Sequence, residues 1–188
     1  MGVPYVPFVG LVGSDLLKRR DDMMICPDPF DPSIESVVVR AMRPDVALLH
    51  GLRADKAGNV DLGVVTDDVL LAEAAHRVVV TVEEVVDALT EAEAQGTFLP
   101  KVLVNVLAHA PYGAHPGGMP GRYTVDAEHM RRYVAHSKDD EAFAAYLQET
   151  VHGVADHQAY LKKVVYRDRP ESDPDATPTM QSQRQSAS

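Results

Sequence analysis

The sequence predicts an α/β domain with a mostly parallel sheet flanked by helices. Between residues 34 and 107, short apolar segments of strand type alternate with amphipathic segments of helix type. The strand-like segments are rich in valine, as expected for strands that are buried on both faces. A loop dominated by Gly and Pro follows the last of them. Ligands of such sheets sit beyond the carboxyl ends of the strands, so we expect the functional site there.

Composition excludes several classes of protein. The chain has 188 residues, 45% of them hydrophobic and 24% charged, which is ordinary for a globular domain. It has no run of eighteen apolar residues and no basic leader, so we expect a cytoplasmic protein and no membrane partner. A net charge of −10 argues against a nucleic-acid partner. Cys26 is the sole cysteine, which excludes an internal disulfide and a cysteine metal cluster.

The first 35 residues are rich in Pro and turn residues, and they resemble the middle of a chain more than its beginning. We expect one short helix within residues 11–20, capped by Ser14 or Asp15. A short apolar run at 37–39 follows, and residues 46–50 read as a buried strand.

The middle of the chain alternates between elements. Asp67 and Asp68 open a predicted helix, residues 78–82 form a continuous β-branched strand, and residues 101–107 form a further strand. Between these two strands we expect a helix over 83–95. Glu83 and Glu84 would supply the acids of its first turn, with Gly96 just past its end.

The remainder of the chain is predicted to be helical and then disordered. Thr124 or Asp126 would cap a helix, and an amphipathic stripe runs from 143 to 154, with a continuation toward 165. Residues 168–188 are rich in Pro, Ser, Gln and Asp and contain little that is apolar, which predicts a disordered polar tail. We therefore expect one domain over residues 1–167.

The Gly/Pro loop is the strongest functional signal. Residues 111–121 read P-Y-G-A-H-P-G-G-M-P-G, and seven of these eleven are Gly or Pro. A stiff loop that ends at a helix start can hold backbone N–H groups against the oxygens of a ligand. We expect such donors near Gly113, Gly117 and Gly118, with Tyr112 and His115 as directed side-chain donors.

Three other groups of residues can be explained by a purely structural role. Asp55 and Asn59 in A-D-K-A-G-N could bind a ligand, but Asp and Asn also satisfy their own backbone in turns, and we favour a turn that shapes the rim of the site. Glu83 and Glu84 follow a strand where a catalytic carboxylate could project, yet a helix-start role is favoured. The eight histidines show no zinc-helix spacing, so we expect surface and capping roles and no metal.

Several segments together resemble the alpha (A) subunit of family I CoA-transferases, of the glutaconate CoA-transferase type. They are P-D-V-A-L-L-H-G-L-R-A-D-K-A-G-N-V (44–60), V-V-V-T-V-E-E-V-V (78–86) and A-P-Y-G-A-H-P-G-G-M-P-G-R-Y-T-V-D-A-E-H (110–129), joined by the opening V-P-Y-V-P-F-V-G-L-V-G-S-D-L-L (3–17). The resemblance covers about residues 3–165. It implies the fold of the NagB/RpiA/CoA-transferase superfamily, incomplete at the N-terminus.

The resemblance also implies a chemistry. Family members move CoA between carboxylic acids through a glutamate that attacks the acyl-CoA thioester and passes through an acyl–glutamyl anhydride and a glutamyl–CoA thioester. That glutamate sits in a Ser-Glu-Asn-Gly motif, typically on the beta subunit, and this chain lacks the motif. The glycine-rich region that normally opens the alpha chain is absent too. We therefore expect a partner in the form of a homologous beta (B) subunit, acyl-CoA and carboxylate as substrates, no catalytic residue here, and no cofactor.

Two alternatives stay open. A CoA-ester hydrolase of the same fold would use water in place of the carboxylate acceptor. A truncated chain could also be a non-catalytic binding or assembly module. Because a sheet that lacks its first strands exposes apolar surface, association with another chain is expected in each case.

Overall fold

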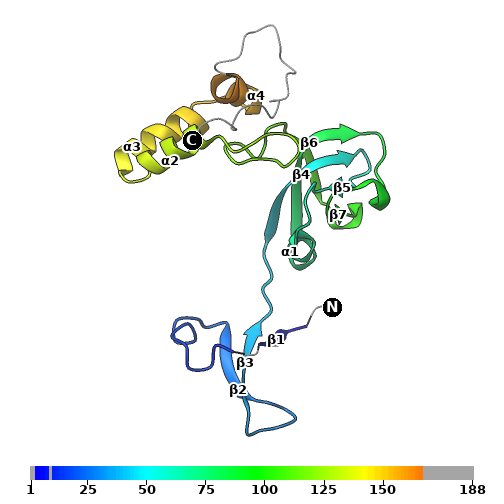
Figure 1. Ribbon diagram of the computed structural model, residues 1–188, viewed down its shortest axis with the longest axis vertical. Helices are drawn as coiled ribbons and strands as arrows, with labels where there is room; N and C mark the ends of the chain where they lie inside the picture. The colour runs from blue at the N-terminus through cyan, green and yellow to red at the C-terminus, as the bar shows by residue number, and fades with distance from the viewer. Residues whose placement is uncertain (1–2, 9, 167–188) are drawn as a thin grey trace, which may run out of the picture. The chain divides into compact units, whose positions relative to one another are not determined.

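The computed structural model describes residues 3–8 and 10–166, and the predicted tail at 168–188 lies outside this range. The chain divides into two compact units, residues 1–45 and residues 46–188 (Figure 1). None of the helices in the described residues is long and apolar enough to cross a membrane.

The first unit is a three-stranded antiparallel sheet in the order β1-β3-β2. Its strands are β1 (Tyr5–Phe8), β2 (Met23–Pro27) and β3 (Glu35–Arg40). The short helix expected within residues 11–20 is wrong, because this segment forms turns. Leu11 and Gly13 both adopt positive φ, 63° and 80°, and a right-handed helix cannot contain such residues.

The second unit contains a five-stranded sheet in the order β7-β5-β4-β6-β8. The parallel part consists of β4 (Val46–Asp55), β6 (Arg77–Val86) and β8 (Val106–His109). The short strands β5 (Val60–Asp61) and β7 (Phe98–Leu99) join one side in antiparallel pairing. The predicted α/β class is confirmed.

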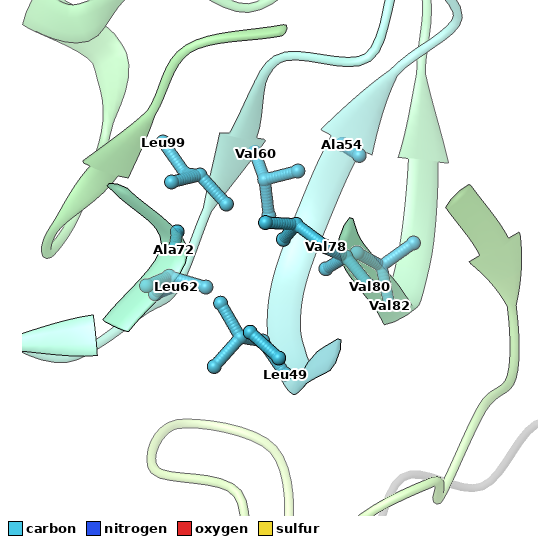
Figure 2. Close-up of a cluster of buried hydrophobic side chains, with 10 residues drawn as sticks. Leu49, Ala54, Val60, Leu62, Ala72, Val78, Val80, Val82 and Leu99 are labelled. Carbon is cyan, nitrogen blue, oxygen red and sulfur yellow. The ribbon is translucent and has the colours of Figure 1, made fainter. Parts of the chain in front are cut away.

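One face of this sheet carries the core. Side chains alternate along β4 and β6, so that Ala47, Val78, Val80 and Val82 are at most 2% exposed. Helix α1 (Asp68–Ala74) adds Ala72 to the cluster, and its start at Asp67 and Asp68 agrees with the sequence. Figure 2 shows the three valines of β6 and Ala72 gathered with Val60 of β5 and Leu99 of β7.

The opposite face is divided along its length. Toward the carboxyl ends of the strands it presents His50, Thr81 and Glu83, which are half-buried or better. Toward the amino ends it presents Leu48 and Val106, which are 74% and 51% exposed. This second half is an apolar sheet surface in contact with water, and below we call it the open face.

The helix expected over 83–95 is wrong. Strand β6 continues to Val86 because β4 continues beside it, with Arg53 opposite Glu84 and Asp55 opposite Val86. Parallel pairing of the β-branched residues overrides the helix signal of the two glutamates. The only helical turn of this segment is one 3₁₀ turn at Glu91–Glu93.

The segment around this turn is fastened by a buried carboxylate. Asp61 on β5 is 0% exposed, and it accepts hydrogen bonds from the backbone N–H of Gly63 and of Gln95 at 2.9 Å each. Arg53 approaches the same carboxylate at 3.3 Å. Burial raises the pKa of Asp61, but these donors outweigh it and hold the pKa below its ordinary value.

The chain after residue 100 leads to a helical region. A 3₁₀ turn at Lys101–Leu103 replaces the first part of the strand expected over 101–107, and β8 begins only at Val106. The helices are α2 (Ala127–His136), α3 (Asp140–Leu147) and α4 (His157–Tyr160), and π-helical turns follow at Gln148–His152 and Leu161–Val165. The expected cap at Asp126 is confirmed, since its carboxylate accepts from the N–H of His129 at 2.8 Å.

Replacing Asp61 by Asn should destabilise the second unit by about 2–4 kcal/mol, because the amide N–H₂ would face backbone donors in a buried site. Urea denaturation followed by circular dichroism measures this change. Asp87→Asn is the matched control, because that side chain is 94% exposed and pairs only with Lys56 among the described residues. Equal denaturation midpoints for the two variants would contradict the role assigned to Asp61.

Candidate functional site

Glu83 lies at the centre of the polar site on the second unit. Its side chain is 6% exposed and projects from β6 on the face opposite the core. The carboxylate accepts hydrogen bonds from the Tyr123 hydroxyl at 2.6 Å and from the Tyr112 backbone N–H at 2.7 Å. His50 supplies a third contact at 2.6 Å. One carboxylate therefore joins two strands to both sides of the Gly/Pro loop.

His50 is oriented by two contacts. Its Nε2 faces the Glu83 carboxylate, which as an anion can only accept, so Nε2 carries a proton and donates. Its Nδ1 faces the Thr81 hydroxyl at 2.8 Å. Strand register places His50 opposite Thr81, two residues before Glu83, so the pairing of β4 with β6 builds the site directly.

The charge of Glu83 is stabilised by its donors. Burial raises the pKa of Glu83, but the hydrogen bonds from His50, Tyr123 and Tyr112 outweigh burial, and the net pKa lies below its ordinary value of 4.5. The pKa of the Tyr123 hydroxyl is raised. Burial is the larger cause, and the hydrogen bond to Glu83 raises it further. The pair is thus an ionised acid and a neutral phenol.

Two tyrosines stiffen the loop. The rings of Tyr112 and Tyr123 stack with centroids 4.6 Å apart. Tyr112 has a φ of 57°, a conformation that a bulky residue adopts only when its surroundings hold it there. The Tyr123 hydroxyl also accepts from the N–H of Ala114 at 3.1 Å.

The helical region holds the loop from its other side. His157 of α4 lies 2.7 Å from the carbonyl of Pro111. His115 lies 2.6 Å from the Tyr160 hydroxyl and 3.2 Å from Asp126. The Asp126 N–H donates to the carbonyl of Pro116 at 3.0 Å. The expected loop is therefore a fixed structure whose backbone positions are determined on both sides.

The three glycines expected to supply donors differ from one another. Gly113 donates its N–H to the carbonyl of Ala110 at 2.9 Å, which closes a turn. Gly117 and Gly118 are half-buried, and neither donates its N–H to another described residue. The expectation that these two adjacent groups donate to a ligand therefore stays a prediction.

Close packing explains why these positions are glycine. A Cβ on Gly113 would lie 2.7 Å from Cε1 of His50, and one on Gly117 would lie 2.8 Å from the Ala114 carbonyl oxygen. A Cβ on Gly118 would lie 3.0 Å from the backbone nitrogen of Val125. Side chains at these positions would push the backbone of the loop out of place.

Asp55 and Asn59 are placed apart from the loop, and within the described residues no hydrogen bond joins the two groups. The Asp55 carboxylate accepts from the N–H and the side-chain amide of Asn59 at 2.9 and 2.8 Å, and from the N–H of Leu89 at 3.2 Å. The Asn59 side-chain oxygen accepts from the N–H of Lys101. The polar atoms of this turn form hydrogen bonds with other residues of the chain, as expected for residues that stabilise a turn.

Sequence reasoning misses the importance of Glu83, His50 and Tyr123. The sequence pattern assigns Glu83 to a helix start, whereas it belongs to a strand and bonds to residues 29 and 40 positions away. One signal is present: a carboxylate just past a buried β-branched run projects on the face opposite that of the preceding valine. His129, expected at the surface, is 7% exposed and bonds to the Tyr146 hydroxyl.

Comparison with known proteins shows that the chain is similar to coenzyme A transferases. Residues 29–110 match the model of the coenzyme A transferase family. The chain is 32% identical to the A subunit of 3-oxoadipate CoA-transferase from Pseudomonas knackmussii over 164 residues, and 32% identical to the A subunit of glutaconate CoA-transferase from Acidaminococcus fermentans over 181 residues. Each alignment covers 87% of this chain and 57% of the relative.

Comparison of folds also shows a similarity to a CoA-transferase. The crystal structure of glutaconate coenzyme A-transferase from Acidaminococcus fermentans superposes on 86% of this chain and 56% of that chain, with a TM-score of 0.77 and 29% identity. The chain is a homologue of coenzyme A transferase A subunits. This confirms the resemblance seen in the sequence. The homologue spans a little over half the length of the relatives it matches.

Replacing Glu83 by Gln should destabilise the second unit by about 2–4 kcal/mol, because the amide cannot accept all three donors and its N–H₂ would oppose one of them. Urea denaturation measures the loss. Glu84→Gln is the control: the neighbouring glutamate has a side chain that is 47% exposed and pairs with Arg122, so its loss should cost no more than about 0.5 kcal/mol. Equal losses for the two variants would contradict the central role of Glu83.

Stability should depend on pH through the same carboxylate. Because the pKa of Glu83 is lower in the folded than in the unfolded chain, its contribution is complete above the ordinary pKa of 4.5 and is lost as the pH falls through the folded pKa. The difference in unfolding free energy between the unsubstituted chain and Glu83→Gln should therefore shrink as the pH is lowered from about 6 to about 3. A difference that is constant over this range would rule out an ionised Glu83.

Proposed function

We propose that this chain is the alpha-subunit-like component of a CoA-transferase that moves CoA between carboxylic acids. The observation that carries the proposal is the pair of unengaged N–H groups at Gly117 and Gly118, on a firmly held loop of a CoA-transferase A-subunit homologue. Acyl-CoA and a carboxylate are the substrates, and no further cofactor is required.

The loop would act on the oxygen of the thioester carbonyl. Attack of a carboxylate on a thioester places negative charge on that oxygen, and preorganised N–H donors lower the energy of this state. Two donors on adjacent residues, held by bonds to β6 and to the helical region, need no reorganisation when the charge develops. In this proposal Tyr112 and His115 line the same wall, while Gly113 shapes it.

Glu83 is unsuited to be the nucleophile of this reaction. Its side chain is 6% exposed, its carboxylate already accepts three hydrogen bonds, and its pKa is lowered. A nucleophile must reach the acyl carbon and retain a reactive lone pair. This supports a glutamate supplied by a separate chain, the homologous beta (B) subunit, while Glu83 positions the loop.

The turn at Asp55 and Asn59 has a supporting part in this proposal. Its polar groups bond to one another and to Leu89 and Lys101, so it would define the rim of the site through its backbone.

The open face of the sheet supports association with a partner chain. Leu48 is 74% exposed on β4, with Val46 beside it at 46% and Val106 on β8 at 51%. Contact with another polypeptide would remove this apolar surface from water, at roughly 25 cal/mol per Å² buried.

The reaction can be tested on the chain co-purified with its B subunit. We expect acyl-CoA to be consumed only when a carboxylate acceptor is added, with the new acyl-CoA formed in equal amount. Consumption without an acceptor would indicate hydrolysis and contradict transfer. No consumption by a complex that contains an intact B-subunit glutamate would contradict the enzyme assignment.

The role of the loop can be tested by Gly118→Ala in the same complex. The new Cβ forces the backbone near Val125 to give way, which should displace the N–H and reduce kcat by about tenfold or more. Gly121→Asn is the control in the same loop, because Gly121 has a φ of 79° that Asn tolerates and open space around it. Equal rates for Gly118→Ala and the unsubstituted complex, with unchanged circular dichroism, would remove Gly118 from the site.

A further inference from the structure

His115, Asp126 and His129 form a compact cluster between the Gly/Pro loop and the start of α2. Each offers one possible ligand atom, and these three atoms all lie within 4.8 Å of one another. The rings of the two histidines are 5.2 Å apart between centroids. Within residues 3–8 and 10–166, this is the one group of three such side chains with metal-ligand spacing.

The distances fit a small divalent cation. Zinc binds imidazole nitrogen and carboxylate oxygen at about 2.0–2.2 Å, so two ligands of one tetrahedral ion are about 3.3–3.5 Å apart. His115 Nε2 and the Asp126 Oδ2 oxygen are already 3.2 Å apart. The third ligand atom, on His129, lies within 4.8 Å of both.

Each ligand is oriented by a second contact. His115 directs its other ring nitrogen, Nδ1, at the Tyr160 hydroxyl at 2.6 Å, and His129 Nε2 lies 2.7 Å from the Tyr146 hydroxyl. Asp126 uses Oδ1 to cap α2 by accepting from the His129 N–H, which leaves Oδ2 directed at His115. Metal sites are commonly built with such outer contacts, which fix the imidazole ring and its tautomer.

Burial is uneven across the cluster. The side chain of His115 is 6% exposed and that of Asp126 is 37% exposed, while His129 is 7% exposed. A cation would therefore enter from the side of Asp126. Three protein ligands with access for solvent on one side are typical of sites that keep a fourth position for water or a substrate oxygen.

We propose that His115, Asp126 and His129 bind one divalent transition-metal ion, with zinc as the best match to two imidazoles and one carboxylate. The ion would tie the Gly/Pro loop, through His115, to α2. This reverses our sequence expectation of no metal, because the spacing of the two histidines in the chain concealed their proximity in the fold. The proposal stands on the cluster alone and does not depend on the CoA-transferase assignment.

Binding can be measured on the full chain, purified without a histidine tag and stripped with EDTA. Titration with Zn²⁺ should give one bound ion per chain by calorimetry and by metal analysis. Titration with Co²⁺ should give the visible absorption of a four- or five-coordinate ion. Less than about 0.2 equivalents bound at saturating Zn²⁺ would overturn the proposal, since a built three-ligand site fills at saturation.

Variants locate the site. Asp126→Asn can still cap α2 but loses the anionic ligand, and His115→Gln removes one imidazole; each should weaken Zn²⁺ binding by about a hundredfold. Tyr146→Phe keeps all three ligands and should weaken binding by about tenfold, as loss of an outer contact does. His76→Gln and His152→Gln are the controls, because neither histidine belongs to such a cluster among the described residues. Binding lost in the controls, or retained in both ligand variants, would overturn the assignment.

One measurement needs no substitution. X-ray absorption spectroscopy of the zinc-loaded chain should show nitrogen and oxygen neighbours with the outer-shell pattern of two imidazoles. A sulfur neighbour would place the ion at Cys26 and overturn the proposal, as would a spectrum without imidazole.

Discussion

The arrangement of the second unit depends on one ionised carboxylate. Glu83 accepts hydrogen bonds from a histidine on the neighbouring strand and from both ends of the Gly/Pro loop. Strand register places Glu83 beside His50, since His50 lies opposite Thr81 and Glu83 is two residues further along β6. The carboxylate also accepts the N–H of Tyr112 and so helps to hold the unusual backbone at this residue. Fold and site are therefore one hydrogen-bonded structure.

The two halves of the loop have different chemical capacities. Near Tyr112 and Tyr123 the backbone and side chains are engaged by Glu83, so this part gives rigidity. Near Gly117 and Gly118 the N–H groups have no acceptor among the described residues, and in the proposed function this is the part that would receive the ligand. Rigidity next to unengaged donors is the arrangement by which an enzyme stabilises a developing charge without moving.

Local sequence patterns correctly predict the elements that neighbouring residues determine. The β-branched run at 78–82, the cap at Asp126 and the start of α1 at Asp67 and Asp68 each follow from neighbouring residues, and each is found. The errors occur where another constraint overrides the pattern of neighbouring residues. Glu83 and Glu84 have the composition of a helix start, but pairing with residues of β4 about thirty positions earlier keeps them in a strand. Residues 11–20 have capping residues too, yet positive φ at Leu11 and Gly13 makes turns there. Composition alone singles out the Gly/Pro loop, whereas the carboxylate that holds it is placed by this same long-range pairing.

The open face has a consequence for how the polypeptide can exist in a cell. Leu48 and Val106 are exposed on strands of one sheet, and β8 stands at its edge with only β6 as neighbour. A surface of this kind attaches to whatever apolar surface it meets first, including another copy of itself. Its state of dispersion then depends on how soon that surface is covered after the chain leaves the ribosome. In the proposed complex with a B subunit, balanced synthesis of the two chains would be a requirement as strict as any side chain in the site.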